Sequence, residues 1–267
     1  MNENELLSYN QLGLIPGPAE NKEDFFLRAA YSLNIQSKIQ GNSLNIDTAL
    51  KDAQDIYDIS PAWVPILHEK KGLFPWHGGS IWIFQLKEKD PLCALIQLNP
   101  QCRWKKAEEI ALHELCHIGR LAFQEPKFEE VIAYRSSKSR FSKYLGGLIQ
   151  NQIESLLFVI TLALILIVDL YLLLNGTLEQ MITLSWLKLI PACMILYAFA
   201  RNFILQRQFD SALKNIEPFF TRPMAALYRL TDHEIIQFSK WKKEKIKSYI
   251  DTQESLRWKV IRLAYSL

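Results

Sequence analysis

The 267-residue sequence predicts a mostly helical α+β protein that contains a short β-hairpin and a hairpin of two membrane-spanning helices. Three observations favour this fold class. Two runs of strand-like composition, 80–86 and 92–99, are separated by a short polar segment. A helical stretch over about 104–123 follows them and carries two histidines on one face. An almost uninterrupted apolar run then covers 156–174, which is long enough to cross about 30 Å of hydrocarbon.

The chain before the first strand predicts an arm and two helices. Residues 1–20 are polar and rich in turn formers, so we expect a flexible, extended arm there. Apolar residues recur at helical spacing over 23–33 and 47–57. The segment 61–79 is rich in proline, glycine and tryptophan and predicts a loop. Together with the strands and the histidine helix, the chain over 21–150 is expected to form one metal-binding domain.

The histidine helix carries the sequence H-E-L-C-H at 113–117. His113 and His117 stand four residues apart, which places them about 40° apart on one helical face. Two imidazoles in this arrangement can bind one Zn²⁺ ion at about 2 Å each. Glu114 follows the first histidine and can take a proton from a zinc-activated water. The alternative is an accidental match in an ordinary buried helix.

A catalytic zinc ion needs a third protein ligand and one open position. The chain turns at Pro126, and a second helix is expected to begin there with Glu129 and Glu130 near its start. Adjacent helical residues point about 100° apart, so only one of the two carboxylates can face the metal. The small residue Ala133 lies on the face of Glu130 and allows a close approach of the two helices, which favours Glu130. The alternative is that both glutamates are surface residues of a helix's first turn.

The apolar run at 156–174 is followed by a polar turn and a second apolar run over 181–205. Residues 151–206 are therefore expected to form a transmembrane hairpin of two helices. Asp169 and Lys188 interrupt its two arms and could pair with each other. A helical hairpin buried inside a soluble protein is the alternative.

The flanking charges predict the orientation of this hairpin. Basic residues precede the first span and close the second, whereas Glu179 is the charged residue of the connecting turn. The positive-inside rule then places the domain before the hairpin and the tail after it in the cytoplasm. The four cysteines form no closely spaced pair, which agrees with a reducing compartment. The first 20 residues show no cleavable signal.

Residues 207–267 predict a basic, helical cytoplasmic tail. Within it, Thr231 and Glu234 have the spacing of a capping box that opens a helix. The lysines that follow this helix form a charged face that is either solvated or in contact with anionic headgroups. The net charge of the whole chain is only +3, so nucleic acid is not an expected partner.

The two motifs together resemble those of a known family. H-E-L-C-H at 113–117 followed by E-V-I-A at 130–133 resembles the gluzincin type of zinc metallopeptidase, whose pattern is H-E-x-x-H and then E-x-x-A on a later helix. The HtpX-like and BlaR/MecR-like branches combine this motif with transmembrane helices, and H-I-G-R at 117–120 is similar to a run of the latter. The resemblance covers about 92–135. These peptidases usually carry the glutamate after further apolar spans, and their pattern usually ends in Asp, where this chain has Tyr134.

The resemblance implies a zincin-like catalytic domain that binds Zn²⁺ through His113, His117 and Glu130. It also implies that Glu114 is the general base that activates a water molecule for peptide hydrolysis. Asp210, beyond the hairpin, is an alternative acidic ligand. The donor to the oxyanion stays open among four residues: Tyr134, Arg135, His77 and His233.

The function expected from these features is an integral membrane zinc metallopeptidase with a cytoplasmic catalytic domain, whose substrate is a peptide or protein near the bilayer. The alternative is a non-catalytic membrane anchor or scaffold whose basic tail binds lipid or a protein partner. Glu114 favours catalysis, because a purely structural metal site needs no base at that position.

Overall fold

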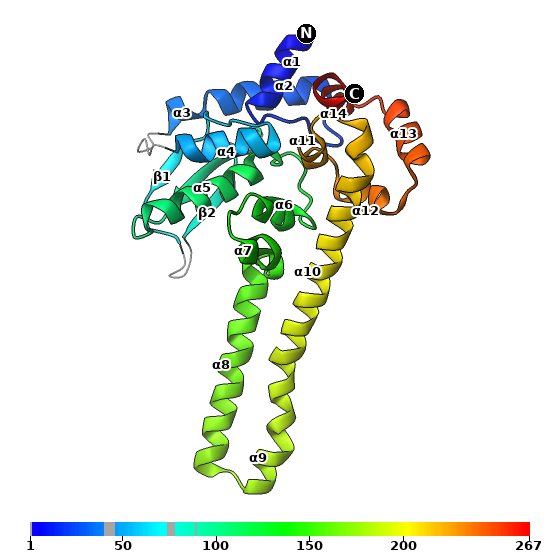
Figure 1. Ribbon diagram of the computed structural model, residues 1–267. Coiled ribbons are helices and arrows are strands. Elements are labelled where there is room, and N and C mark those ends of the chain that lie inside the picture. Colours follow the sequence, from blue (N-terminus) through cyan, green and yellow to red (C-terminus); the bar gives the residue numbers. More distant parts are fainter. Residues whose placement is uncertain (1, 40–45, 74–77, 89) are drawn as a thin grey trace.

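The computed structural model describes residues 2–39, 46–73, 78–88 and 90–267. A small sheet is packed among helices, and two long helices extend from that assembly on one side (Figure 1). The predicted fold class, a mostly helical α+β protein with two long apolar helices, is confirmed.

The sheet has three strands, β1 (Ile66–His68), β2 (Gly79–Phe84) and β3 (Cys93–Leu98). Strand β3 lies in the centre, with β2 antiparallel on one side and β1 parallel on the other. The predicted hairpin is therefore confirmed. Strand β1 was not predicted, because a run of three residues inside a segment rich in turn formers carries no periodicity.

Helix α5 (Trp104–Gly119) connects the sheet to the other helices of the domain. It packs against β2 and β3 and also against α4 (Asp47–Tyr57). Helix α6 (Glu129–Arg135) packs on α5 and is followed by α7 (Arg140–Leu145). The predicted helix at 47–57 is confirmed, and α2 (Lys22–Leu33) confirms the one at 23–33. The helix expected over 104–123 forms but ends at Gly119, and residues 120–123 form turns. The short helix α3 (Ile35–Lys38) follows α2.

The expectation of an extended arm over residues 1–20 is wrong. Helix α1 (Glu3–Gln11) occupies nine residues of this segment, and Leu6 is buried in the core together with Leu14 and Ile15. Helix α1 packs on α14 (Leu256–Tyr265), where Asn10 donates a hydrogen bond to the Tyr265 hydroxyl. The burial of α1 thus depends on residues at the other end of the chain.

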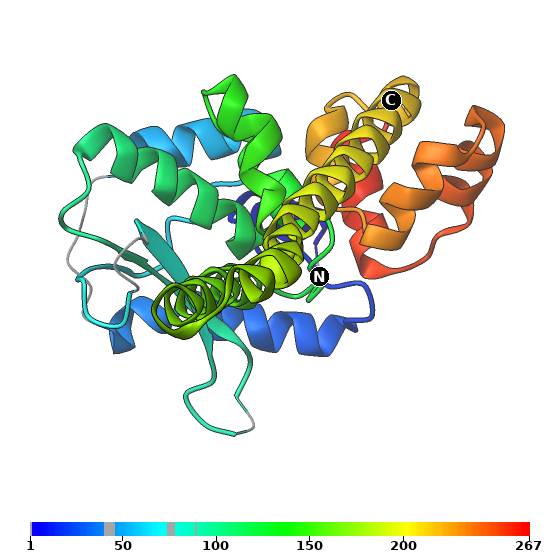
Figure 2. The same cartoon turned by 90° about the horizontal axis from the view of Figure 1, so that it is seen from below.

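The predicted hairpin consists of α8 (Gln152–Asn175), α9 (Leu178–Leu184) and α10 (Leu189–Ile216). Two segments, Ile153–Asn175 and Leu178–Phe219, are long and apolar enough to cross a membrane. The most apolar stretch of each segment is almost entirely exposed, whereas Leu205, Phe209, Ala212 and Ile216 at the end of α10 belong to the core. Figures 1 and 2 show α8 and the first part of α10 extending together from the rest of the molecule.

Two ion pairs join the arms of the hairpin. The Lys188 ammonium lies 3.1 Å from Asp169, which is the pairing that the sequence suggested. Nearer the sheet, the Arg201 guanidinium pairs with Glu154 and donates a hydrogen bond to the Leu148 carbonyl oxygen. The arms are therefore linked at two levels along their length.

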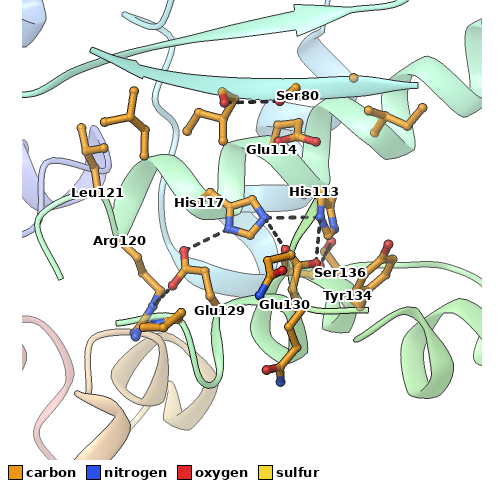
Figure 3. A pocket seen from close by; sticks show the side chains of 18 of the residues that line it. Ser80, His113, Glu114, His117, Arg120, Leu121, Glu129, Glu130, Tyr134 and Ser136 are labelled. Carbon is orange, nitrogen blue, oxygen red and sulfur yellow. Dashed lines mark hydrogen bonds and ion pairs between the residues drawn. The ribbon is translucent and has the colours of Figure 1, made fainter. Parts of the chain in front are cut away.

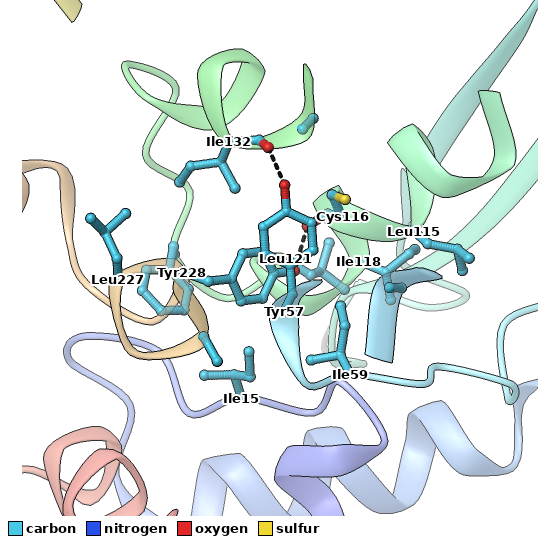
Figure 4. Close-up of a cluster of buried hydrophobic side chains, with 14 of the residues drawn as sticks. Ile15, Tyr57, Ile59, Leu115, Cys116, Ile118, Leu121, Ile132, Leu227 and Tyr228 are labelled. Carbon is cyan, nitrogen blue, oxygen red and sulfur yellow. Dashed lines mark hydrogen bonds between the residues drawn. The ribbon is translucent and has the colours of Figure 1, made fainter. Parts of the chain in front are cut away.

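The chain after the hairpin folds back onto the N-terminal elements. It forms α11 (Pro223–Tyr228), α12 (Asp232–Lys240), α13 (Lys243–Thr252) and α14. Helix α11 packs on α4, and its residues belong to the same core as those of α5 (Figure 4). The expected boundary between hairpin and tail, at 206/207, falls inside α10. The predicted capping box at the start of α12 is confirmed, with reciprocal hydrogen bonds between Thr231 and Glu234.

Glu234 also forms a buried ion pair with Arg257. Both guanidinium Nη atoms donate to its carboxylate at 2.9 Å, and the Trp258 indole donates to it at 2.8 Å. Neutralising Glu234 would leave a buried guanidinium without its countercharge. We therefore expect Glu234→Gln to lower the free energy of unfolding by about 3–5 kcal/mol. Thermal unfolding in detergent measures this loss, and Glu244→Gln, an exposed glutamate on α13, serves as the control with no expected change.

The same ion pair predicts a dependence on pH. Burial raises the pKa of Glu234, but the charge and hydrogen bonds of Arg257 outweigh burial and hold it below its usual value. The pair therefore stabilises the folded state fully above the unfolded pKa of about 4.3, and the stabilisation is lost as the pH falls below it. The difference in melting temperature between wild type and Glu234→Gln should stay constant from pH 6 to 8 and shrink below pH 4.5. A difference that grows on acidification would contradict this assignment.

Candidate metal centre

Helix α5 presents two imidazoles side by side on one face (Figure 3). The Nε2 atoms of His113 and His117 lie 3.3 Å apart. Two ligands held about 2 Å from a tetrahedral zinc ion are themselves separated by about 3.3 Å. The spacing of four residues has therefore produced a pair of nitrogen atoms at the separation that a shared metal ion requires.

Glu130 on α6 provides an oxygen to the same point. Its Oε2 atom lies 3.5 Å from Nε2 of His113, and its Oε1 atom lies 3.7 Å from Nε2 of His117. The ligand atoms of all three residues lie within 4.8 Å of one another, so this group could hold a metal ion. Ala133, one turn further on α6, is buried, as the sequence expectation of close helix packing requires.

Glu129 faces in a different direction from Glu130 and has a different set of contacts. Its Oε1 atom lies 3.0 Å from Nδ1 of His117, and its Oε2 atom accepts a hydrogen bond from Nε of Arg120 at 3.0 Å. An ionised carboxylate accepts hydrogen bonds only, so Nδ1 of His117 carries a proton, and in the neutral ring Nε2 then presents its lone pair. Glu129, a competing ligand in the sequence, therefore orients a histidine instead.

The carboxylates of α6 determine the electrostatics of the site. Burial alone would lower the pKa of His117, but the hydrogen bond to Glu129 and the charge of Glu130 raise it to about 9. Burial raises the pKa values of both glutamates, but the histidines, and for Glu129 also Arg120, outweigh burial and hold these pKa values below their usual range. The group therefore attracts a cation, which is a proton or a metal ion.

A large cavity of about 1080 Å³ surrounds the three residues. Its floor is α5, and β2 forms one wall with Ser80 and Ile81. The opposite wall comes from α6 and from the chain just before α8, including Asn151. Glu114 is buried, lines the same cavity and lies between α5 and β2 (Figure 3). The cavity is large enough for a segment of several extended residues.

The structure separates the four candidates for an oxyanion donor. Tyr134 lines the cavity, and its ring lies 4.5 Å from that of His113. Arg135 donates instead to Gln206 on α10 and to Asp210. This contact also places Asp210, the alternative acidic ligand, against an arginine. His233 is exposed and contacts Gln237, and His77 lies outside the described residues.

Arg120 is the residue of this region that sequence reasoning missed. It is fully buried one turn beyond His117 and contacts Glu129 as described above. Its position in the H-I-G-R run was a local signal, but the carbonyl oxygens that accept its Nη1 hydrogen bonds lie more than 100 residues away.

No known protein family, curated protein or solved structure matches this chain. What the structure shows of the expected gluzincin pattern is the group of His113, His117 and Glu130, able to hold a metal ion.

The geometry predicts that Glu130 contributes directly to zinc binding. Glu130→Ala removes one of three ligand atoms, so we expect zinc affinity to fall by more than about 100-fold. This loss exceeds the loss of about 10-fold to 100-fold that is typical when a residue only contacts a ligand. Competition with a chromophoric chelator measures this affinity on the purified protein. Glu108→Ala, which removes a glutamate of α5 that does not line the cavity, is the control. Equal affinities for wild type and Glu130→Ala would remove Glu130 from the ligand set.

Proposed function

We propose that this protein is an integral membrane zinc metallopeptidase. The observation that carries the proposal is the convergence of His113, His117 and Glu130 on one point, with the carboxylate of Glu114 in the same cavity. Three protein ligands and an open position are the composition of a catalytic rather than a structural zinc site. A zinc ion bound there would activate water and polarise the peptide carbonyl.

The residues around the three ligands have distinct roles in this proposal. Glu114 accepts the proton of the attacking water and delivers it to the leaving nitrogen. Burial, followed by the charges of Glu130 and Glu114, raises the pKa of Tyr134 to about 12, so its hydroxyl keeps its proton at neutral pH. Tyr134 is therefore our choice of donor to the developing oxyanion.

An extended peptide suits the cavity better than a compact small molecule does. Strand β2 is an edge strand of the sheet, because the strand order is β1-β3-β2. Its residues Gly79–Ile81 line the cavity, so its free edge can pair with the backbone of an extended substrate.

Membrane insertion is supported by the exposure of the two apolar segments. Such a surface greatly exceeds the apolar patches that soluble monomers leave in water. Because basic residues flank both ends of the hairpin nearest the sheet, we propose that the cavity and the C-terminal helices lie on the cytoplasmic side.

Zinc content and hydrolysis together test the function. Wild-type protein purified in detergent should contain about one zinc ion per chain. His113→Ala should lose it, whereas Glu114→Ala should retain it and lose peptidase activity by about 100-fold to 10,000-fold. Elemental analysis and cleavage of a peptide library provide the two measurements. Folded wild-type protein that takes up no supplied zinc would refute the peptidase and leave the scaffold as the better description.

Cysteine labelling tests the topology. In a background with Cys102 and Cys193 replaced by serine, Glu179→Cys should react with a membrane-impermeant maleimide applied outside intact cells. Glu244→Cys should react only after the cells are lysed, because α13 lies on the cytoplasmic side. The reverse pattern would invert the orientation. Release of the chain from membranes without detergent would exclude the spans.

A further inference from the structure

A buried arginine lies between the candidate metal ligands and the C-terminal part of the chain. Arg120 donates from Nε to Glu129, and its Nη1 atom donates to the carbonyl oxygens of Tyr228 at 2.7 Å and Leu230 at 2.9 Å. Its Nη2 atom lies 3.6 Å from Oδ1 of Asp232. The guanidinium therefore has contacts with α6 on one side and with the segment from α11 to α12 on the other.

These contacts form a continuous series that ends at His117, a candidate metal ligand. The carbonyl oxygens of Tyr228 and Leu230 fix the plane of the Arg120 guanidinium. The guanidinium in turn fixes one carboxylate oxygen of Glu129. The other carboxylate oxygen of Glu129 contacts Nδ1 of His117. A histidine that binds a metal through Nε2 depends on such an acceptor at Nδ1 for its orientation and basicity. The fixed fork of arginine suits this arrangement, whereas the single ammonium of lysine cannot hold both carbonyls and Glu129.

The C-terminal segment also contacts the backbone of α5 directly. The Tyr228 hydroxyl donates to the carbonyl oxygen of Cys116, the residue before His117 (Figure 4). A Cβ atom at Gly119 would lie 2.3 Å from that hydroxyl, so this approach requires a glycine. The turn of α5 that carries His117 is therefore supported by residues that follow the second long helix.

We propose that Arg120 is a positioning residue for His117, acting through Glu129, and that residues 228–232 complete the metal site by holding Arg120. The inference rests on the metal site of the proposed function and is independent of whether peptides are hydrolysed there. It assigns the C-terminal helices a role in forming the site, beyond that of a tail.

The test measures metal binding by the full-length chain in detergent. Zinc affinity is determined by chelator competition, and the visible absorption of the Co²⁺-loaded protein reports the ligand geometry. We expect Glu129→Gln and Arg120→Lys each to weaken zinc binding by about 10-fold to 100-fold and to alter the Co²⁺ spectrum. Because both residues act through the same series of contacts to His117, the double variant should bind zinc no more weakly than the weaker-binding single variant.

Two controls separate positioning from charge and from stability. Glu108→Gln removes the same charge from α5 outside the cavity and should change zinc affinity by less than about threefold. Arg28→Lys alters a buried arginine of α2 that pairs with Glu20, and should lower the melting temperature without changing zinc affinity. If Arg120→Lys does not fold, Glu129→Gln still tests the contact with His117. Tyr228→Phe keeps the carbonyl oxygen that accepts from Arg120 and removes the hydroxyl bond to Cys116, so weaker zinc binding in this variant supports the direct contact with α5 and unchanged binding excludes it.

The outcomes distinguish the inference from the proposed function. Failure of the wild type to bind zinc would refute the metal site itself. Normal zinc affinity and an unchanged Co²⁺ spectrum in Glu129→Gln, with zinc bound by the wild type, would overturn the inference alone. Multiplicative losses in the double variant would show that Arg120 acts by a route other than Glu129.

Discussion

Helix α5 lies between the buried core and an open cavity, and the packing of the other elements depends on this position. One side of the helix buries Ala111, Leu115 and Ile118 in the main core, between the sheet and α4. The other side carries the histidines into an open cavity. A polar group next to a core is costly unless it has a partner, and α6 provides those partners as Glu129 and Glu130. The packing of α6 on α5 is therefore also what brings together the three residues that could hold a metal ion.

The features that the sequence could predict are those with local causes. The strands of the hairpin, the bounds of α4 and the capping box of α12 all follow from residues a few positions apart. The expectation that Glu130, and not Glu129, faces both histidines also rested on nearby residues, and the structure places Glu130 in the group that could hold a metal ion. The burial of α1 and the contacts of Arg120 were not predictable, because their partners, such as Tyr265 and Tyr228, lie in the C-terminal helices. A pattern in one stretch of sequence contains no information about which distant stretch will cover it.

The long hairpin is joined to the metal-binding region by polar contacts near its base. Arg135, at the end of α6, donates to Gln206 and Asp210 on α10. Asn202 on α10 donates to the Tyr144 carbonyl oxygen, which ties α10 to the end of α7. The segment after α7 in turn passes close to Glu130, since a Cβ atom at Gly147 would meet Cβ of Glu130 at 3.8 Å. Helix α6, which carries the candidate ligand Glu130, is thus held between the sheet side of the molecule and the base of the hairpin.

The residues that hold Arg120 are synthesised long after Arg120 itself, so its contacts form late during translation. Its carbonyl acceptors are 108 and 110 residues further along the chain, and both long apolar helices lie between them. At 5–20 residues per second, a ribosome needs roughly 5–20 seconds to make this intervening stretch. Until Leu230 has emerged, the guanidinium lacks these acceptors, although both histidines and both glutamates have already been made. A nascent chain therefore cannot acquire the complete set of contacts around His117 before its apolar hairpin has been synthesised.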